Sequence, residues 1–547
     1  MNTKIYKKVA VRVISYLLPL TSYLFMTSCE NDFDAQIYGQ LSTTNFPATA
    51  ADYESYLMDC YIPFSVNWSY NLSGADMHNF YVSEGGLNRL FDMTSDESAP
   101  WRIGSWGGPW TYYGEAQFDD MKYAGRGDKV PSNHYEKVRD ITRFTKIIDE
   151  IEKADPAVLP TEQQQEFLGE ARLLRGMMMY YLLHMYGPVP VILDPALVGN
   201  DEAEAALERP TLDQMTQYIT DDLEYAVSHV AEKQAEKGRY TADYARFCLM
   251  RHYLNEGYHV NGYYQKAYEL FSQFKGGYTL FQNGENPYAD QFKIANEFNC
   301  ETIMAVSCNS NATGSGPEGN FNPFSWYALS WEVSKYDDKG EPTPYVKQGG
   351  GWGQTFNVSK QFYDTFEPGD LRAMTIETRY YHVFGYWVTE EHLGSVWDGF
   401  IINKYPIETE TSFQGTDIPL ARWADALLLY AEADVRAHNT VSASAIDCVN
   451  QVRHRAGLAN LSADKTSSVD AFLDALLMER GHELYYEGCR KVDMIRFNKY
   501  YTLMKETGRE PSSEYFPLPD YAVNQAKESG KTLTQYFTRD NYDGPQR

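Results

Sequence analysis

Residues 161–188 read TEQQQEFLGEARLLRGMMMYYLLHMYGP, and this stretch decides the fold class of the 547-residue chain. Its apolar side chains recur at intervals of three and four, which draws one stripe along an α-helix; the stripe is Phe167, Ala171, Leu174, Met178, Tyr181 and Met185. Thr161 is a suitable N-cap, and Gly187 with Pro188 ends the helical pattern. The stretch therefore predicts one long amphipathic helix.

Helical patterns continue on both sides of this stretch. They cover residues 49–61, 135–154, 211–229, 241–273, 418–438, 442–456 and 469–503. Helix pairs with short connections indicate a repeat solenoid of the tetratricopeptide type, although the consensus of about 34 residues does not overlay on this chain. We therefore predict a mostly α fold, with a tetratricopeptide-like scaffold of helical pairs.

Two regions differ from this helical scaffold. Residues 62–134 and 275–417 are rich in glycine, asparagine, proline and aromatic residues, with short strand-like runs at Thr302–Cys308 and Phe400–Lys404. We expect both regions to be irregular elaborations that pack on the helices and carry the ligand face. Residues 49–547 are then a single domain.

The composition excludes several classes of protein. Hydrophobic residues make up 43% and charged residues 22%, so neither a disordered chain nor a multi-span membrane protein is expected. The formal net charge of −27 would repel nucleic acid. Aromatic residues reach 15%, with 44 tyrosines, which is more than a core usually needs and points to a binding surface.

The first 28 residues have the pattern of a secretory signal peptide, with basic residues and no acidic residue before an apolar run. The run ends in Met26-Thr27-Ser28-Cys29, which resembles a bacterial lipoprotein box, so we expect Cys29 to be lipidated and residues 29–48 to form a tether. The acidic residues at 30–34 look like the surface-export signal of Bacteroidetes lipoproteins, although a solvated tether would look the same. Because no later stretch has about 18 consecutive apolar residues, we expect attachment to the membrane through the lipid alone.

The candidate motifs for catalysis lack the neighbouring residues that they require. Residues 314–319 match G-x-G-x-x-G, but residues 320–323 include a proline and cannot open the helix that a dinucleotide site requires. The cysteines show no metal-binding spacing; Cys300 and Cys308 are free to pair, and scattered buried thiols are the more common arrangement. We expect no cofactor, no metal and no enzymatic activity.

A dense set of charges lies near the C-terminal end, spaced by threes and fours on one helical face. Its members are Glu479, Arg480, Glu483, Glu487, Arg490, Asp493 and Arg496. They could form an active site, or a structural network in which arginines hold carboxylates through two hydrogen bonds each. We favour the structural network.

Four blocks of sequence, in order, resemble the SusD/RagB family of outer-membrane nutrient-binding lipoproteins. The blocks are Glu170–Arg175 with Tyr186–Pro190, Arg422–Ala433, Asn450–Arg453 with Arg455–Leu458, and Glu479–Arg496. Lys491 stands where the family often has an aromatic residue. The resemblance implies a tetratricopeptide-like fold and a glycan-binding protein that acts as the lid of a TonB-dependent, SusC-like outer-membrane transporter. It also implies an alternative, a structural lid or peptide-binding member without a sugar site.

Candidate ligand residues follow from what a glycan needs, namely flat aromatic faces for sugar rings and polar side chains for hydroxyl groups. Trp106 and Trp352 are the strongest candidates, because flanking glycines give them little bulk to pack against. The further candidates are Trp101, Trp110, Tyr113, Trp326, Trp331, Asp96, Arg102 and Asn309. A third aromatic cluster is Tyr380, Tyr381, Tyr386 and Trp387. For any one of these aromatics, a place in the core is the alternative.

Overall fold

The computed structural model describes residues 46–66, 79–81, 86–101, 114–118, 134–200, 202, 207–309, 321–322, 324–348, 351, 354, 356–410 and 414–536. Contacts divide the chain into two units, Met1–Ala48 and Thr49–Arg547. All elements below belong to the second unit. Among the described residues, no helix has the length and apolar character that crossing a membrane requires.

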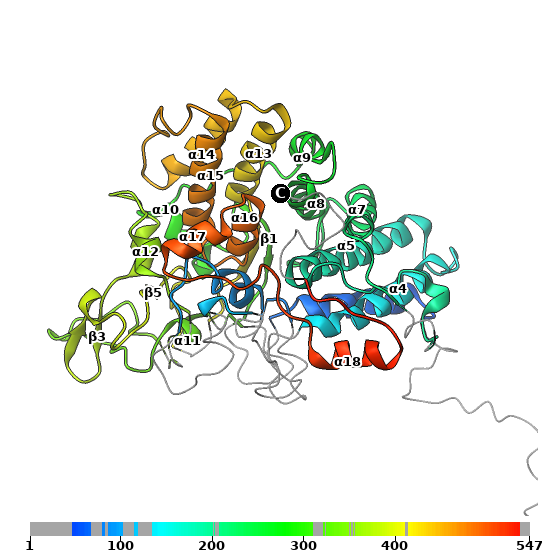
Figure 1. The fold of residues 1–547 in the computed structure, drawn as a ribbon, viewed down its shortest axis with the longest axis horizontal. Coiled ribbons are helices and arrows are strands. Elements are labelled where there is room, and N and C mark those ends of the chain that lie inside the picture. Colours follow the sequence, from blue (N-terminus) through cyan, green and yellow to red (C-terminus); the bar gives the residue numbers. More distant parts are fainter. Residues whose placement is uncertain are drawn as a thin grey trace, which may run out of the picture. The chain divides into compact units, whose positions relative to one another are not determined.

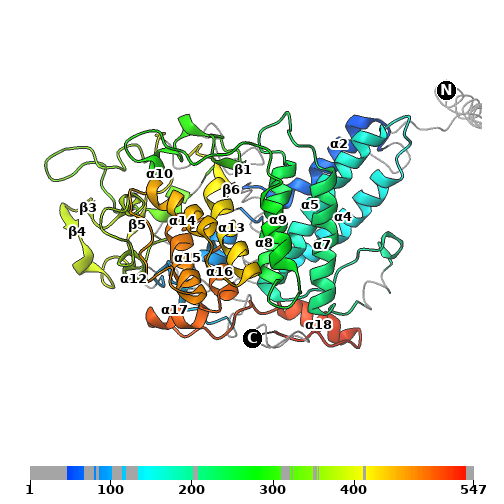
Figure 2. The ribbon, with the colours of Figure 1, turned by 90° about the horizontal axis from the view of Figure 1, so that it is seen from above.

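The scaffold is a row of helices in which each packs on the next (Figures 1 and 2). Its first part contains α2 (Ala50–Met58), α4 (Lys137–Glu152), α5 (Thr161–Tyr186), α7 (Leu212–His229), α8 (Ala242–Glu256) and α9 (Tyr263–Phe271). Its second part contains α13 (Trp423–His438), α14 (Ala443–Arg455), α15 (Val469–Leu484), α16 (Arg490–Arg496) and α17 (Tyr500–Glu506). The prediction of a mostly α, tetratricopeptide-like fold is confirmed.

Helix α5 spans the predicted range, but its N-cap is Pro160, and Thr161 is the first helical residue. Gly176 lies in the middle of this helix, where a Cβ atom would be 3.0 Å from Leu223 of α7. Arg175 donates two hydrogen bonds to Asp222 of α7, of 2.7 and 2.8 Å. The small residue and the ion pair together bring the two helices close.

Three predicted helical ranges are interrupted in the structure. Residues 241–273 form α8 and α9, separated by a turn at Gly262, whose φ of 86° suits glycine. Residues 418–422 form a strand rather than the start of α13. The range 469–503 contains α15, α16 and the start of α17, and Tyr486, Gly488 and Asn498 between them have positive φ. The apolar residues keep their helical spacing across these breaks, so the sequence pattern does not mark them.

The elaborations contain short elements beside the second half of the scaffold (Figure 1). Strand β1 (Thr302–Val306) pairs antiparallel with β6 (Ile418–Arg422). The pairs β2 (Ile376–Glu377) with β5 (Ile401–Ile402), and β3 (Tyr380–His382) with β4 (Tyr386–Val388), are also antiparallel. Short helices are α10 (Pro287–Asp290), α11 (Phe324–Ala328) and α12 (Lys360–Tyr363), and α18 (Asp520–Glu528) follows the scaffold. Short 3-10 or π turns are Asp59–Phe64, Asn88–Asp92, His134–Glu136, Pro195–Leu197, Ile294–Asn296, Ala373–Thr375 and Glu390–His392.

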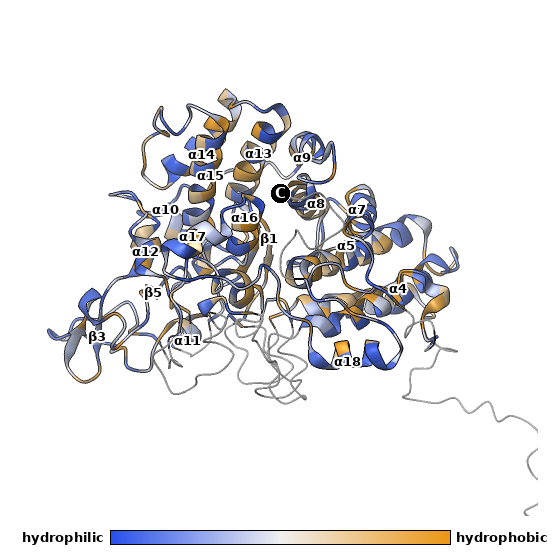
Figure 3. Cartoon of the chain, in the orientation of Figure 1, coloured by the Kyte–Doolittle hydropathy of each residue, from blue (hydrophilic) through white to orange (hydrophobic). Residues whose placement is uncertain are grey.

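Hydropathy matches the packing of these helices. Figure 3 shows α18 as hydrophilic over most of its surface with one hydrophobic band, and Ala522 is its buried residue. Most of α5 is buried, so its side chains are apolar on nearly every face from Phe167 onward. Cys300 is exposed and Cys308 is half-buried, and both are free thiols.

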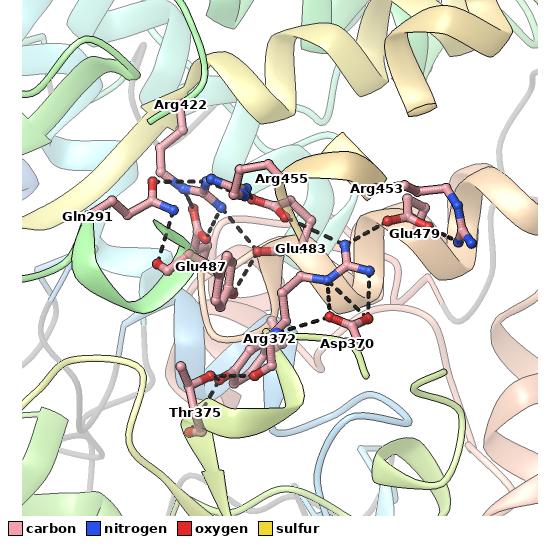
Figure 4. A network of polar contacts seen from close by, with 12 residues as sticks. Gln291, Asp370, Arg372, Thr375, Arg422, Arg453, Arg455, Glu479, Glu483 and Glu487 are labelled. Carbon is pink, nitrogen blue, oxygen red and sulfur yellow. Dashed lines mark hydrogen bonds and ion pairs between the residues drawn. The ribbon is translucent and has the colours of Figure 1, made fainter. Parts of the chain in front are cut away.

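The C-terminal charges form a buried ion-pair network (Figure 4). Arg422 donates to Glu301 at 2.6 Å, to Glu483 at 2.8 Å and to Glu487 at 2.6 Å. Arg455 and Arg372 also pair with Glu483. Burial alone would raise the pKa of Glu483, but the three arginines lower that pKa to about 2.

The other members of the predicted charge cluster are buried and paired as well. Arg480 donates to Asp425 at 2.7 Å and to Asp493 at 2.8 Å, and Arg496 donates to Glu432 at 2.9 Å. These pairs join α13, α15 and α16. The structure thus shows the buried ion-pair network that the sequence predicts.

Asp92, at the end of the π turn Asn88–Asp92, caps the start of α16. Its carboxylate accepts backbone hydrogen bonds from Gly488 at 2.7 Å, Cys489 at 3.1 Å and Arg490 at 3.3 Å. Arg490 in turn holds Asp96. The segment around residue 92 is thereby fixed to a helix almost 400 positions later in the chain.

Lys491 on α16 is fully buried in a cage of aromatic rings. Its ammonium lies 4.2 Å from the ring centroids of Phe118 and Phe516 and 5.5 Å from that of Tyr500. Within the described part of the chain, Nζ has no hydrogen-bond partner. Burial lowers the pKa of Lys491 to about 7, although Glu514 favours the charged form.

Candidate functional site

Five of the predicted ligand residues lie outside the described residues. They are Trp106, Trp352, Trp110, Tyr113 and Arg102. For these five, the role in ligand binding stays a prediction.

Two of the remaining candidates are buried in the structure. Trp101 is only 5% exposed and belongs to the hydrophobic core, so its ring faces offer no platform to a ligand. Asp96 is buried, and its carboxylate accepts hydrogen bonds from Arg490 at 2.8 and 2.9 Å. The Trp101 ring therefore packs in the core, and the Asp96 carboxylate takes part in a buried ion pair.

Trp326 and Asn309 occupy intermediate positions. Trp326, on α11, is half-buried and packs against the core. Asn309 is exposed just after β1 and is not part of the pocket described next. Neither position gives direct support for a ligand contact.

Trp331 has the placement that a ligand platform requires. Its side chain is 59% exposed at the edge of a pocket of about 330 Å³. The pocket is lined by Leu329, Ser330, Trp331, Val333, Ser334, Lys335, Tyr345, Gln348, Gly351 and Val383. Gly351 packs against the 329–330 backbone so closely that a Cβ atom would be 2.7 Å from the Leu329 carbonyl oxygen. The structure therefore brings Trp331 together with the residue that precedes Trp352.

Tyr345 gives this pocket a polar group that finds no partner in the described part of the chain. The residue is 3% exposed, and among the described residues its hydroxyl has no hydrogen-bond partner. Burial raises the pKa of Tyr345 well above its usual value, so the hydroxyl keeps its proton and can donate or accept. A buried hydroxyl without a partner is costly. The oxygen is closed off in this structure, so a ligand would reach it only by moving the wall of the pocket.

A second exposed ring lies next to Trp331 at the tip of the β3–β4 hairpin. Phe384 is 74% exposed, and its ring centroid is 6.4 Å from that of Trp331 in an edge-on arrangement. Tyr386, from the third predicted cluster, is 40% exposed on the same hairpin. Sequence reasoning missed Phe384; the signal for it was the Phe384-Gly385 pair, which places a ring at a tight turn.

The other members of the third cluster are engaged with the protein. Tyr380 is buried and packs edge-on against Trp397. The guanidinium of Arg379 lies 4.7 Å from the ring centroid of Trp387, and the indole N–H of Trp387 donates to Asp338 at 3.2 Å. Tyr381 is half-buried, and its ring centroid is 5.4 Å from that of Trp387.

Three further pockets, of about 350 to 400 Å³, lie among the described residues. Their aromatic lining residues are Phe362, Tyr135 and Tyr521, of which none is exposed. The pocket at Trp331 therefore fits a ligand with flat apolar faces better than these pockets do.

Fold and site together define a tetratricopeptide-like helical scaffold that presents an aromatic pocket on an irregular face. Residues 233–538 match the model of the SusD family, and residues 88–254 match a model described as starch-binding associating with outer membrane. The chain belongs to the SusD family.

Individual relatives agree with this assignment. A SusD-like protein of Bacteroides ovatus is 26% identical over 454 residues, covering 79% of this chain and 74% of that protein. A solved laminarin binding SusD-like protein has a TM-score of 0.67 at 19% identity, covering 89% of this chain and 99% of that one. Surface glycan-binding protein A from Bacteroides thetaiotaomicron, solved in complex with laminarihexaose, has a TM-score of 0.65 at 18% identity, with coverage of 89% and 99%.

Proposed function

We propose that this protein is a surface glycan-binding lipoprotein that captures an oligosaccharide or polysaccharide and delivers it to a SusC-like, TonB-dependent outer-membrane transporter as its lid. The observation that carries the proposal is the pocket beside Trp331, whose lining combines an exposed indole with Tyr345, a buried phenol that has no hydrogen-bond partner among the described residues. The laminarin-binding and laminarihexaose-bound proteins of the same fold support it.

The pocket has the chemistry that sugar binding needs. The face of Trp331 provides a platform for the apolar side of a pyranose ring, and the polar side chains Ser330, Ser334 and Lys335 line the same pocket. The described lining contains no aspartate or glutamate, so the pair of carboxylates that a glycosidase uses is not found there. The function that fits is binding without chemistry on the sugar.

The test is calorimetry and a glycan array, on the wild type and on three variants. Trp331→Ala should weaken binding by about 1 to 3 kcal/mol, as for other stacked aromatics, and should change stability by no more than about 0.5 kcal/mol. Phe384→Ala removes the exposed ring next to Trp331 and should weaken binding by about 1 to 3 kcal/mol as well. Tyr501→Ala, at an exposed tyrosine on α17, is the matched control and should bind like the wild type.

Two outcomes would contradict the proposal. Binding that both pocket variants leave unchanged would place the sugar elsewhere on the protein. Binding to peptides, or to no polysaccharide at all, would favour the peptide-binding or structural-lid alternative.

Membrane attachment and the transporter are separate parts of the proposal. Acylation of Cys29 with more than one chain would hold the protein firmly, whereas a single chain would bind reversibly. In whole cells Cys29→Ala should leave the membrane fraction, and the wild type should co-purify with a TonB-dependent barrel. Retention of the variant in the membrane, or the lack of any barrel partner, would refute these parts.

A further inference from the structure

His382 lies beneath the tip of the β3–β4 hairpin and touches the rings that the tip presents. The residue is 2% exposed. Its imidazole stacks on Tyr386 with a centroid distance of 4.6 Å and lies 4.9 Å from the ring of Phe384. The exposed rings of Phe384 and Tyr386 therefore pack against one buried histidine.

The two imidazole nitrogens have different partners. Nδ1 accepts a hydrogen bond of 3.1 Å from the backbone N–H of Phe384, so Nδ1 carries no proton in this arrangement. Nε2 is 3.8 Å from the carboxylate of Glu332, in the segment that also carries Trp331. The backbone of Glu332 is itself tied to the tip, because its carbonyl accepts from the N–H of Val383 at 2.9 Å.

We propose that His382 is a positioning residue for Phe384 and Trp331, and that protonation of its imidazole releases the hairpin tip and weakens ligand binding. The last step rests on the proposed function of the pocket. In an imidazolium both nitrogens are donors, so an Nδ1 proton would face the Phe384 N–H and the hydrogen bond between them would be lost. The Phe384 ring would then lose its fixed distance to Trp331.

The titratable and charged groups around His382 come from its own hairpin and from two neighbouring segments. Glu332 is the charged group that faces the imidazole, with 3.8 Å between its carboxylate and Nε2. Tyr380 and Tyr386 are the hairpin phenols near it, and Arg379 is engaged with Trp387. His392 lies beyond Tyr386, with 6.4 Å between those two rings.

Hydrogen exchange measured by mass spectrometry tests the proposal without any ligand. Protection of the peptide that contains Phe384, corrected for intrinsic exchange, should fall roughly fivefold between pH 7.5 and pH 5.0, the factor that one neutral hydrogen bond is worth. In His382→Asn the amide oxygen can accept the same hydrogen bond and does not titrate, so its protection should not change.

Binding of laminarihexaose and of the array glycans is the second measurement. The affinity of the wild type should fall by a similar factor at pH 5.0, and that of His382→Asn should not. Equal protection of the wild type at both pH values, or the same loss in His382→Asn, would overturn the proposal. If no glycan binds at any pH, the proposed function fails, while the exchange data still decide whether His382 holds the tip.

Discussion

Replacing Lys491 by methionine should stabilise this protein at acidic and neutral pH. Methionine keeps the length of the side chain inside the aromatic cage and removes the charge that burial penalises. The pKa of Lys491 is lowered to about 7, against about 10.4 for an unburied lysine. Between these values the unfolded chain binds a proton that the folded protein does not, so Lys491 makes the free energy of unfolding rise with pH from 7 to about 10.

The size of the effect follows from the same difference. Three pKa units correspond to about 4 kcal/mol below pH 7, and the ring faces of Phe118, Phe516 and Tyr500 offset about 1 to 2 kcal/mol of this by attracting the ammonium. Lys491→Met should therefore raise the free energy of unfolding by about 2 to 3 kcal/mol at pH 6 and by less than about 1 kcal/mol at pH 10.

Urea denaturation followed by tryptophan fluorescence at pH 6, 8 and 10 measures this difference. Lys505→Met, at an exposed lysine on α17, is the control and should change stability by no more than about 0.5 kcal/mol at each pH. A Lys491→Met protein that is less stable than the wild type at pH 6, or whose gain is the same at every pH, would refute the reasoning.

Two further predictions concern the ion-pair network and the tryptophans flanked by glycine. Glu483→Ala leaves buried arginines without their carboxylate and should lower the free energy of unfolding by about 3 to 5 kcal/mol, with glycan affinity unchanged in the protein that still folds; an unchanged melting temperature with lost binding would reverse the structural interpretation. Trp106→Ala and Trp352→Ala should each weaken glycan binding by about 1 to 3 kcal/mol while leaving the melting temperature nearly unchanged, whereas a loss of stability without a loss of affinity would place these residues in the core.

The helical scaffold could be predicted because its information is local. The apolar stripe from Phe167 to Met185 needs only the 3.6-residue period, and it predicts the range of α5. The breaks near Gly262 and Gly488 could not be predicted this way, because the helical pattern continues on both sides and the break depends on a positive φ at one residue. The strand at 418–422 depends on pairing with β1, more than a hundred residues earlier.

The residues of the candidate site were harder to predict, because a ligand contact requires an exposed side chain and the sequence does not show which side chains are exposed. Trp101 and Trp331 look alike in sequence, yet one is 5% and the other 59% exposed, because the first lies in the core and the second at a pocket edge. Phe384 was missed because it has a glycine on one side only, at Gly385. It lies at the tip of a tight hairpin and is more exposed than Trp331. Asp96 was read as a ligand residue because its partner, Arg490, lies 394 positions away in the sequence.

The cap that Asp92 places on α16 has a consequence for the order of folding. Asp92 and Asp96 are buried carboxylates whose partners, Gly488 to Arg490, are among the last scaffold residues to be synthesised. Before residues 488–490 are in place, burying the two carboxylates would carry a large desolvation penalty. We therefore expect the segment around Asp92 to pack only after the intervening helices have formed. Closing a loop of this length costs conformational entropy, and contacts this distant in sequence are associated with slow folding. We therefore expect a late, concerted step in which the two ends of the scaffold meet, and a chain that stops before residue 488 should lack it altogether.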